Sequence, residues 1–236
     1  MTKPTRVRLI DLENPFVESM DGMCEVLLVR HGEQHLRENI PLGESVDPPL
    51  SELGEQQAAA VGERLAPVPL DAVFSSSLRR AMKTAGEISR HHSLEPSIVA
   101  GIEEIELWKH APQDKGLLDI YDRQELTAIY RGVNASRMNS SWPFCEDPVA
   151  FKSRVVNSID GLIEQNLGRR IAVACHGGVI NAYLSHLTGS PYDNLVTVHH
   201  TSITTVRGAD TRRALLTIND YSHVMDFQTK RGDMNA

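Results

Sequence analysis

The chain has 236 residues, of which 41% are hydrophobic and 23% charged, so we expect one domain spanning residues 1–236. Its 24 basic and 31 acidic residues give a net charge of −7, which argues against a nucleic acid or an anionic membrane as partner. The longest apolar runs are too short for a membrane span, and residues 1–23 lack the apolar core of a secretory signal. Three widely spaced cysteines, Cys24, Cys145 and Cys175, form no CxxC pair and indicate reduced thiols in the cytoplasm.

Short β-branched or apolar runs alternate with longer helical patterns along the chain, and no internal repeat interrupts them. Residues 1–23 are an N-terminal extension, in which "VRLIDL" (7–12) forms either an edge strand or an ordered tail. The expected strands are 24–29, 71–75, 171–175, 201–206 and 214–218. The expected helices are 51–66, with Ser51 as N-cap, then 78–92, 150–166 and 179–187. This order predicts a three-layer α/β/α protein with a mainly parallel central sheet and helices on both faces.

The segment 105–146 fits this alternation least well. It contains two prolines and two glycines around one helical stretch, 118–131, and we expect a small insertion that covers the substrate. Its basic residues are Lys109, His110, Lys115, Arg123, Arg131 and Arg137. They either bind an anionic group of a ligand, a carboxylate or a phosphate, or form a solvated helix face, which is the interpretation we favour.

Polar clusters follow three of the expected strands. Arg30 and His31 end "LLVRHGEQ", "SSSLRRA" (75–81) follows the second strand, and "CHGG" (175–178) opens a helix. Ligands of open parallel sheets gather at the carboxyl ends of strands, and helix N-termini favour anions. Any one cluster could be structural, with Gly32 supplying a positive φ in a solvated turn. Their shared location instead predicts an anion site, strengthened by Arg30, by Arg79 or Arg80, and by His176.

Three kinds of site are disfavoured: a cysteine-based phosphatase site, a nucleotide-binding loop and a zinc site. A cysteine phosphatase needs an arginine six positions after its thiolate, but Asn181 stands there after Cys175. There is no G-x-x-x-x-G-K-[ST] loop, and "HGEQH" has Gly32 and Gln34 where zinc motifs need glutamate. We therefore predict no metal and no cofactor. Surface or packing roles are expected for the remaining histidines: His35, His91, His92, His110, His186, His199, His200 and His223.

Six segments, in this order, carry a resemblance to a known family: "LLVRHGE", "DPPLSELGEQQAAAVGERL", "VFSSSLRRAMKTA", "GIEEIEL", "VACHGGVI" and "INDYSHV". Over about residues 24–226 the chain resembles the histidine phosphatase superfamily, also called phosphoglycerate mutase-like. The resemblance implies that His31 is the nucleophile, that Arg30, Arg80 and His176 contact the phosphate, and that Glu104 donates the proton. Gly177 would add a helix N-terminus to the phosphate site and Arg37 a cation at its mouth.

The chemistry also follows from the residue types. Catalysis of phosphoryl transfer consists largely of positioning and stabilising the charge on three oxygens, a task for arginines and a histidine. His31 must attack as the neutral imidazole, with its other nitrogen fixed by an acceptor such as a turn carbonyl. One carboxyl can protonate the leaving group and then deprotonate water. Glu103 and Glu106 neighbour Glu104 and are of the same type, so "IEEIEL" alone does not decide among them, or exclude that all three are solvated charges.

The departures from the family pattern bear on the reaction. Many members read RHG-E-[TS]-x-x-N, whereas this chain has Gln34 and Arg37, and "LWKHAPQDKG" lacks the G-x-W-E-G signature. The Ser and Trp-Asn near the nucleophile of typical mutases are absent. We therefore expect a hydrolase of a small phosphorylated metabolite, ahead of a phosphoglycerate-type mutase and a non-catalytic phosphate-binding module. The oligomeric state is open, with a homodimer as one alternative.

Overall fold

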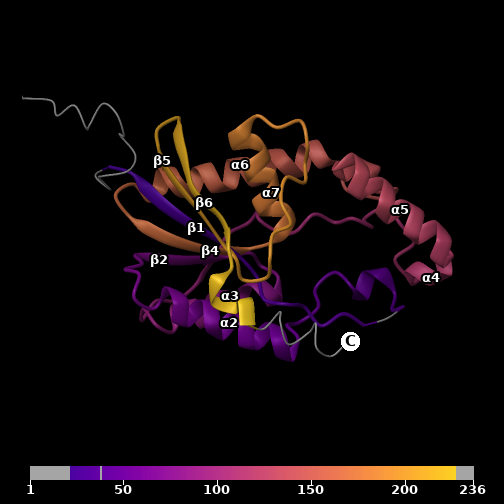
Figure 1. Ribbon diagram of the computed structural model, residues 1–236, viewed down its shortest axis with the longest axis horizontal. Coiled ribbons are helices and arrows are strands. Elements are labelled where there is room, and N and C mark those ends of the chain that lie inside the picture. Colours follow the sequence, from indigo (N-terminus) through magenta and orange to yellow (C-terminus); the bar gives the residue numbers. More distant parts are fainter. Residues whose placement is uncertain (1–21, 38, 227–236) are drawn as a thin grey trace, which may run out of the picture.

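The central sheet of the computed structural model, which describes residues 22–37 and 39–226, has six strands in the order β3-β2-β4-β1-β5-β6 (Figure 1). Their bounds are β1 (Cys24–Arg30), β2 (Ala72–Ser75), β3 (Ser97–Ile98), β4 (Arg170–Cys175), β5 (Ile203–Ala209) and β6 (Arg212–Asp220). Strands β1 to β4 are mutually parallel, while β5 runs antiparallel to β1 and β6 antiparallel to β5. The mainly parallel sheet predicted from the sequence is therefore confirmed.

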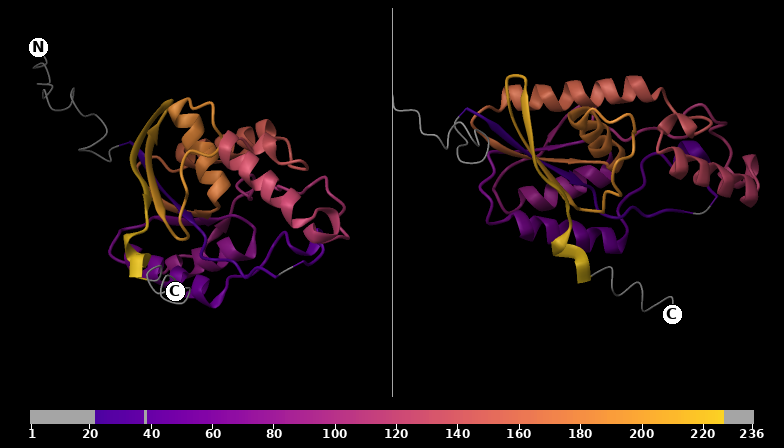
Figure 2. Two further views of the ribbon diagram at one scale, coloured as in Figure 1. Left: turned by 45° about the vertical axis from the view of Figure 1, so that its right-hand side comes forward. Right: turned by 45° about the horizontal axis from the view of Figure 1, so that its top comes forward.

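Helices cover both faces of this sheet (Figure 2). One face carries α2 (Glu52–Leu65) and α3 (Arg79–Ser89), and the other carries α6 (Pro148–Gln165) and α7 (Gly177–Thr188). Side chains of β1 alternate between two buried clusters: Leu27 and Val29 pack with residues of α2 and α3, whereas Val26 and Leu28 pack with residues of α6 and α7. A strand buried on both sides needs a continuous apolar run, which is the pattern that "CEVLLV" shows.

Local sequence signals account for most element ends. The Ser51 hydroxyl accepts a hydrogen bond from the Gly54 N–H and caps α2, as expected. Helix α6 begins two residues earlier than predicted, because Asp147 caps it and Pro148 occupies its first turn. Helix α7 ends at Gly189, whose φ of 63° lies in the left-handed region. The two-residue strand β3 was not among the expected strands, because such a short segment has no periodicity to read.

The single helix expected over 118–131 is wrong. The chain forms α4 (Leu117–Ile120) and α5 (Arg123–Ser136), separated by Tyr121 in an extended conformation. The break follows from Asp122, whose carboxylate accepts hydrogen bonds from two backbone N–H groups, while Glu125 reaches back to the Asp122 N–H. This capping box starts a new helix where hydrophobic periodicity alone predicts a continuous one.

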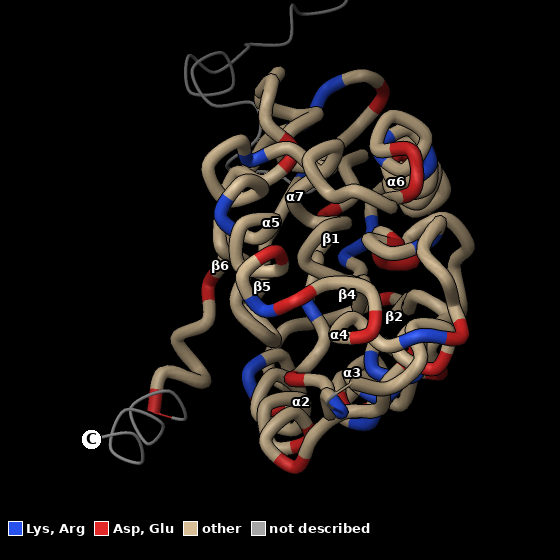
Figure 3. The backbone as a smooth tube through the Cα atoms, turned by 90° about the vertical axis from the view of Figure 1, so that its right-hand side faces the viewer, with Lys and Arg blue, Asp and Glu red and all other residues tan. Residues whose placement is uncertain are grey.

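Segment 105–146, with α4, α5 and the short helix η2 (Asn139–Ser141), lies beyond the carboxyl ends of β1 and β4 (Figure 1). Figure 3 views the molecule from this side, with β1, β4 and β2 at its centre. The three strands are parallel, so the loops that follow them meet at one edge of the sheet. Within the described residues no helix is long and apolar enough to cross a membrane. The expected strand or tail at 7–12 lies outside the described residues.

Candidate active site

His31 directly follows β1 and is almost completely buried, with 2% of its surface exposed. Its backbone N–H donates to the Cys175 carbonyl at 3.0 Å, which continues the β1–β4 ladder by one residue. The Gly32 N–H donates to the Thr84 hydroxyl of α3 at 3.2 Å. These bonds fix the backbone around His31 from both sides, so its ring has a defined direction.

Gly32 is required here by a close backbone approach. It is not among the residues with positive φ, so the alternative interpretation, in which Gly32 supplies a positive φ in a solvated turn, is wrong. A Cβ at Gly32 would instead collide with the carbonyl of Gly54, in the first turn of α2. The backbone at the N-terminus of α2 therefore lies directly against the backbone of the His31 loop. A larger residue at Gly32 or at Gly54 would prevent this approach.

The contacts of the His31 ring define its tautomer. Nδ1 lies 2.6 Å from the Gly32 carbonyl oxygen, which can only accept, so Nδ1 carries the hydrogen. Nε2 receives a hydrogen bond of 3.2 Å from Nε of Arg80, and a guanidinium can only donate. Nε2 therefore presents its lone pair toward the cations. This is the neutral form that the sequence argument requires of a nucleophile.

His176 lies beside His31, with 5.1 Å between the ring centroids. It is fully buried at the N-terminus of α7, and its Nε2 contacts the Ser76 hydroxyl at 2.8 Å. Its Nδ1 is buried and has no hydrogen-bond partner among the described residues. The Ser76 hydroxyl accepts from the Leu78 N–H and can donate its own hydrogen to Nε2, which leaves Nδ1 as an N–H donor. A buried donor without a partner is costly, and one at a helix N-terminus indicates a place for an anion.

Arg30 supplies a second unpartnered donor at the same place. Its Nη1 donates to the Val198 carbonyl at 2.5 Å, while its Nε is buried and finds no partner in the part of the chain that the structure describes. Gly177 begins α7 next to this guanidinium, whose Nε lies 3.4 Å from where a Cβ at Gly177 would be. The geometry thus brings together five of the predicted site residues, Arg30, His31, Arg80, His176 and Gly177. Their binding of a phosphate stays a prediction, which the unpartnered donors here favour.

Burial and neighbouring cations set the protonation of the two histidines. Burial, His176, Arg80 and Arg30 together lower the pKa of His31 well below its ordinary 6.5, in that order of importance. Burial, followed by the same two arginines, likewise lowers the pKa of His176. Both imidazoles are consequently neutral at neutral pH, and His31 needs no deprotonation before it can attack.

The three adjacent carboxylates of the 101–107 loop have different environments. Glu103 is held by Gly101 N–H at 2.8 Å and by the Ser77 hydroxyl at 3.2 Å, and Glu106 pairs at the surface with Lys109. Glu104 alone among them reaches α7, where its Oε2 accepts from the Gly178 N–H at 3.2 Å. A Cβ at Gly178 would collide with Oε1 of Glu104, so a larger residue there would displace this carboxylate. Geometry therefore favours Glu104 as the residue that faces the site.

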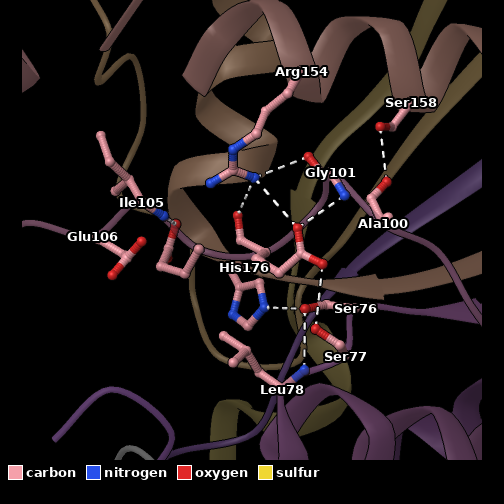
Figure 4. Close-up of polar contacts among 12 residues, drawn as sticks. Ser76, Ser77, Leu78, Ala100, Gly101, Ile105, Glu106, Arg154, Ser158 and His176 are labelled. Atoms are coloured by element: carbon pink, nitrogen blue, oxygen red, sulfur yellow. Dashed lines mark hydrogen bonds and ion pairs between the residues drawn. The ribbon is translucent and has the colours of Figure 1, made fainter. Parts of the chain in front are cut away.

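Arg154 of α6 holds this loop in place (Figure 4). Its Nη1 donates to the carbonyls of Gly101 at 3.0 Å and Glu103 at 2.9 Å, on the N-terminal side of Glu104. Its Nη2 donates to Glu146 at 3.0 Å, and the same Glu146 oxygen accepts from the Glu106 N–H on the other side. Arg154 and Glu146 thus bracket Glu104, although nothing in the sequence connects them with it.

Two predicted cations lie away from this cluster. Arg37 pairs with Glu44 at 3.6 Å and its side chain is 56% exposed. Its placement in the phosphate-binding set, inferred from the sequence, has no support in these contacts. The open choice between Arg79 and Arg80 is resolved in favour of Arg80, because Arg79 is exposed and paired with Asp47.

Sequence reasoning missed four residues around His31. Thr84 and Ser76 orient the nucleophile loop and His176, and Asp47 lies 3.7 Å from Nη1 of Arg80. The His200 ring lies 5.9 Å from the His31 ring, although a surface or packing role was expected for it. Ser76 and Thr84 lie within "SSSLRRAMKTA" and Asp47 begins "DPPLSELGEQQAAAVGERL", so both motifs held a signal, whereas none of the matching segments contains His200.

A cavity of about 520 Å³ opens next to Glu104 and Gly178. It is walled by the 104–107 loop, the end of α5 and the 194–197 loop, with Trp142 on its side. Of the six basic residues of segment 105–146, only Arg137 lines it. Within the described ranges, no three or more His, Cys, Asp or Glu side chains are grouped so that they could hold a metal ion.

Comparisons with known proteins show what the chain is similar to. A probable phosphatase of Schizosaccharomyces pombe is 25% identical over 216 residues, covering 87% of this chain and 97% of that protein. The probable phosphoglycerate mutase GpmB of Salmonella choleraesuis is 27% identical over 173 residues, or 72% and 77% of the two chains. A mycobacterial glucosyl-3-phosphoglycerate phosphatase shares the fold, with a TM-score of 0.67, 24% identity, and 84% and 99% coverage. The family model for the histidine phosphatase superfamily (branch 1) matches residues 26–221, and the chain belongs to that family.

Proposed function

We propose that this protein is a phosphomonoester hydrolase that works through a phosphohistidine on His31. The observation that carries the proposal is the state of the His31 ring. Its Nδ1–H is fixed by the Gly32 carbonyl and its Nε2 lone pair points toward Arg80, in a buried site with unpartnered donors on Arg30 and His176. A phosphoryl group placed there meets a nucleophile and the donors that stabilise its oxygens in the transition state.

The reaction has two steps. In the first, Nε2 of His31 forms a bond to phosphorus, the ester P–O bond breaks, and Glu104 protonates the departing alkoxide. In the second, the Glu104 carboxylate takes a proton from water, whose oxygen attacks phosphorus, and the N–P bond breaks to release inorganic phosphate. Arg30 and Arg80 hold the phosphoryl oxygens in both steps, and His176 contacts them through Nδ1.

The substrate we propose is a small phosphorylated metabolite. The cavity beside Glu104 has the volume of a typical small-molecule site and lies where the leaving group would emerge. Among proteins of this fold, one solved structure is a phosphoserine phosphatase from Entamoeba histolytica in complex with phosphoserine. A cytoplasmic location, in which the three unpaired cysteines stay reduced, remains part of the proposal.

The test is an assay of nitrophenyl phosphate and a panel of phosphorylated metabolites for free phosphate, with phosphoglycerate isomerisation measured in parallel. The proposal predicts phosphate release that a chelator leaves unchanged, with acid-labile phosphate on the protein during turnover. Isomerisation without phosphate release would identify a mutase. Activity that is lost with chelator and restored by zinc or magnesium would show that the chemistry is wrongly assigned.

A further inference from the structure

The cavity beside Glu104 carries almost no charge of its own. Among the described residues that line it, Glu104 is the only acid and Arg137 the only base. The phosphate site next to it holds the buried Arg80 and the partly buried Arg30 beside His31. A substrate that binds across both is therefore met by strong positive charge at its phosphate and by little net charge at its leaving group.

Arg137 is already used to build the cavity wall. Its Nε donates to the Asn194 carbonyl at 2.8 Å and its Nη2 to the Leu195 carbonyl at 2.7 Å. These two nitrogens form the edge with which an arginine grips a carboxylate in a bidentate pair. The face of the guanidinium lies over the Tyr192 ring, 4.9 Å from its centroid. Arg137 thus fastens the end of α5 to the 194–195 loop through its Nε–Nη2 edge, which leaves only the Nη1 side of the guanidinium for an anion.

The rest of the lining suits an uncharged, hydroxylated group. Trp142 meets Trp108 and Tyr130 edge-on, which fixes its ring at the cavity. The carboxamide of Asn134 makes no hydrogen bond within the described residues, so it is available to a ligand hydroxyl. A rigid aromatic ring with a few amide and hydroxyl groups binds carbon chains that carry hydroxyls. A carboxylate is less favoured here, because Glu104 carries the same charge and Arg137 is the only cation among the described lining residues.

We infer that the leaving group is an uncharged, hydroxyl-bearing alcohol, so that the substrate carries its negative charge on the phosphate alone. This inference rests on the proposed hydrolase function and narrows its substrate class. A substrate carboxylate in this cavity would lie near the Glu104 carboxylate and find Arg137 engaged. The inference separates this chain from the phosphoglycerate enzymes among its relatives, because phosphoglycerate carries a carboxylate as well as a phosphate.

Two matched pairs of esters test the inference. Sorbitol 6-phosphate differs from 6-phosphogluconate, and glycerol 3-phosphate from 3-phosphoglycerate, only by a CH₂OH group in place of a carboxylate. Each is measured for phosphate release and as a competitor of nitrophenyl phosphate hydrolysis. We expect the uncharged member of each pair to be favoured by at least about tenfold. Equal behaviour of the two members, preference for the carboxylate, or competition by neither overturns the inference while leaving the hydrolase function intact.

A variant with an added cation provides the second arm. Asn134 is exposed on α5, so Asn134→Lys changes the charge at the cavity without disturbing the core. It should shift the preference toward the carboxylate member by about threefold, the scale of a solvent-exposed ion pair. Asn134→Gln keeps an uncharged amide at this position and controls for loss of the native side chain, so it should shift the ratio of the two rates less than Asn134→Lys does. An unchanged ratio in Asn134→Lys would mean that the leaving group does not occupy this cavity. Failure of the native chain to hydrolyse nitrophenyl phosphate would instead refute the hydrolase function itself.

Discussion

The phosphate end and the leaving-group end of the site are built in different ways. At the phosphate end, His31, Arg80 and His176 are buried and extend from strand ends and helix starts of the central sheet. At the leaving-group end, the walls come from loops and from segment 105–146, outside the sheet. The part of the substrate that is chemically constant thus meets the rigid scaffold. The part that varies between substrates meets an insertion that can change without disturbing the nucleophile.

The largest expected effect comes from the phosphate end. Replacing His31 by alanine removes the phosphoryl acceptor, so we expect kcat to fall by about ten-thousandfold or more while inorganic phosphate still binds to Arg30 and Arg80. Steady-state kinetics and a phosphate-binding titration measure the two properties separately. Loss of both kcat and phosphate binding would make His31 a structural residue. The distinction between a phosphate end that carries the nucleophile and a separate leaving-group end would then be contradicted.

Glu104 stands at the boundary between the two ends. Glu104→Gln should slow hydrolysis of an alkyl phosphate by about a hundred- to ten-thousandfold, the usual contribution of a positioned acid or base. Nitrophenyl phosphate should suffer much less in the phosphorylation step, because its leaving group needs no proton. Phosphoenzyme should then accumulate. Equal losses on both substrates in pre-steady-state phosphorylation would exclude Glu104 as the acid and point to Glu103 or Glu106.

Arg154 should act only through the leaving-group end. Arg154 holds the carbonyls of Gly101 and Glu103 and, through Glu146, the N–H of Glu106. Arg154→Met removes these contacts and should therefore displace the Glu104 carboxyl that lies between them. We expect a loss of about tenfold to a hundredfold on an alkyl phosphate and a smaller loss on nitrophenyl phosphate. Arg154→Lys should restore part of the activity. If Arg154→Met reduces both rates equally, its role is general stability, which thermal unfolding of the same variant would reveal.

The smallest expected effect is on stability against pH. The folded chain holds the pKa of His31 and His176 well below 6.5, so the unfolded chain binds more protons once the pH falls through that value. The free energy of unfolding is therefore highest above about pH 6.5 and decreases as the pH falls below that value. Urea midpoints at pH 7.5 and 5.5 measure this decline. His31→Gln should reduce it, and the exposed control His35→Gln should not. Identical pH dependence in all three proteins would contradict the neutral, desolvated site.

The sequence is most informative about the phosphate end, and the structure explains why. Strand-end positions such as His31 and His176 can be located from hydrophobic runs, because parallel strands bring their carboxyl ends to one edge. The leaving-group end depends on the path of segment 105–146, where a capping box at Asp122 broke the expected helix. Exposed helices of this kind have weak periodicity, so their packing cannot be read from hydrophobic patterns.

Individual residues show the same difference between what can and what cannot be predicted from the sequence. Arg80 was identified by its motif, and its neighbour Arg79 proved to be a surface residue. Arg37 was expected near the phosphate and instead pairs with Glu44, since sequence proximity to His31 says nothing about the direction of a loop. Arg154 and Arg137 lie far from any motif and act through backbone carbonyls, contacts that only the folded chain creates.

The most direct test of the account is the position of the phosphoryl group on the trapped enzyme. Glu104→Gln would be mixed with nitrophenyl phosphate, quenched at alkaline pH, and its peptides analysed by mass spectrometry and phosphorus NMR. Because Nδ1 of His31 is bound to the Gly32 carbonyl, the account predicts phosphate on Nε2 of His31. Phosphate on Nδ1, on another residue, or on no residue during active turnover would contradict it.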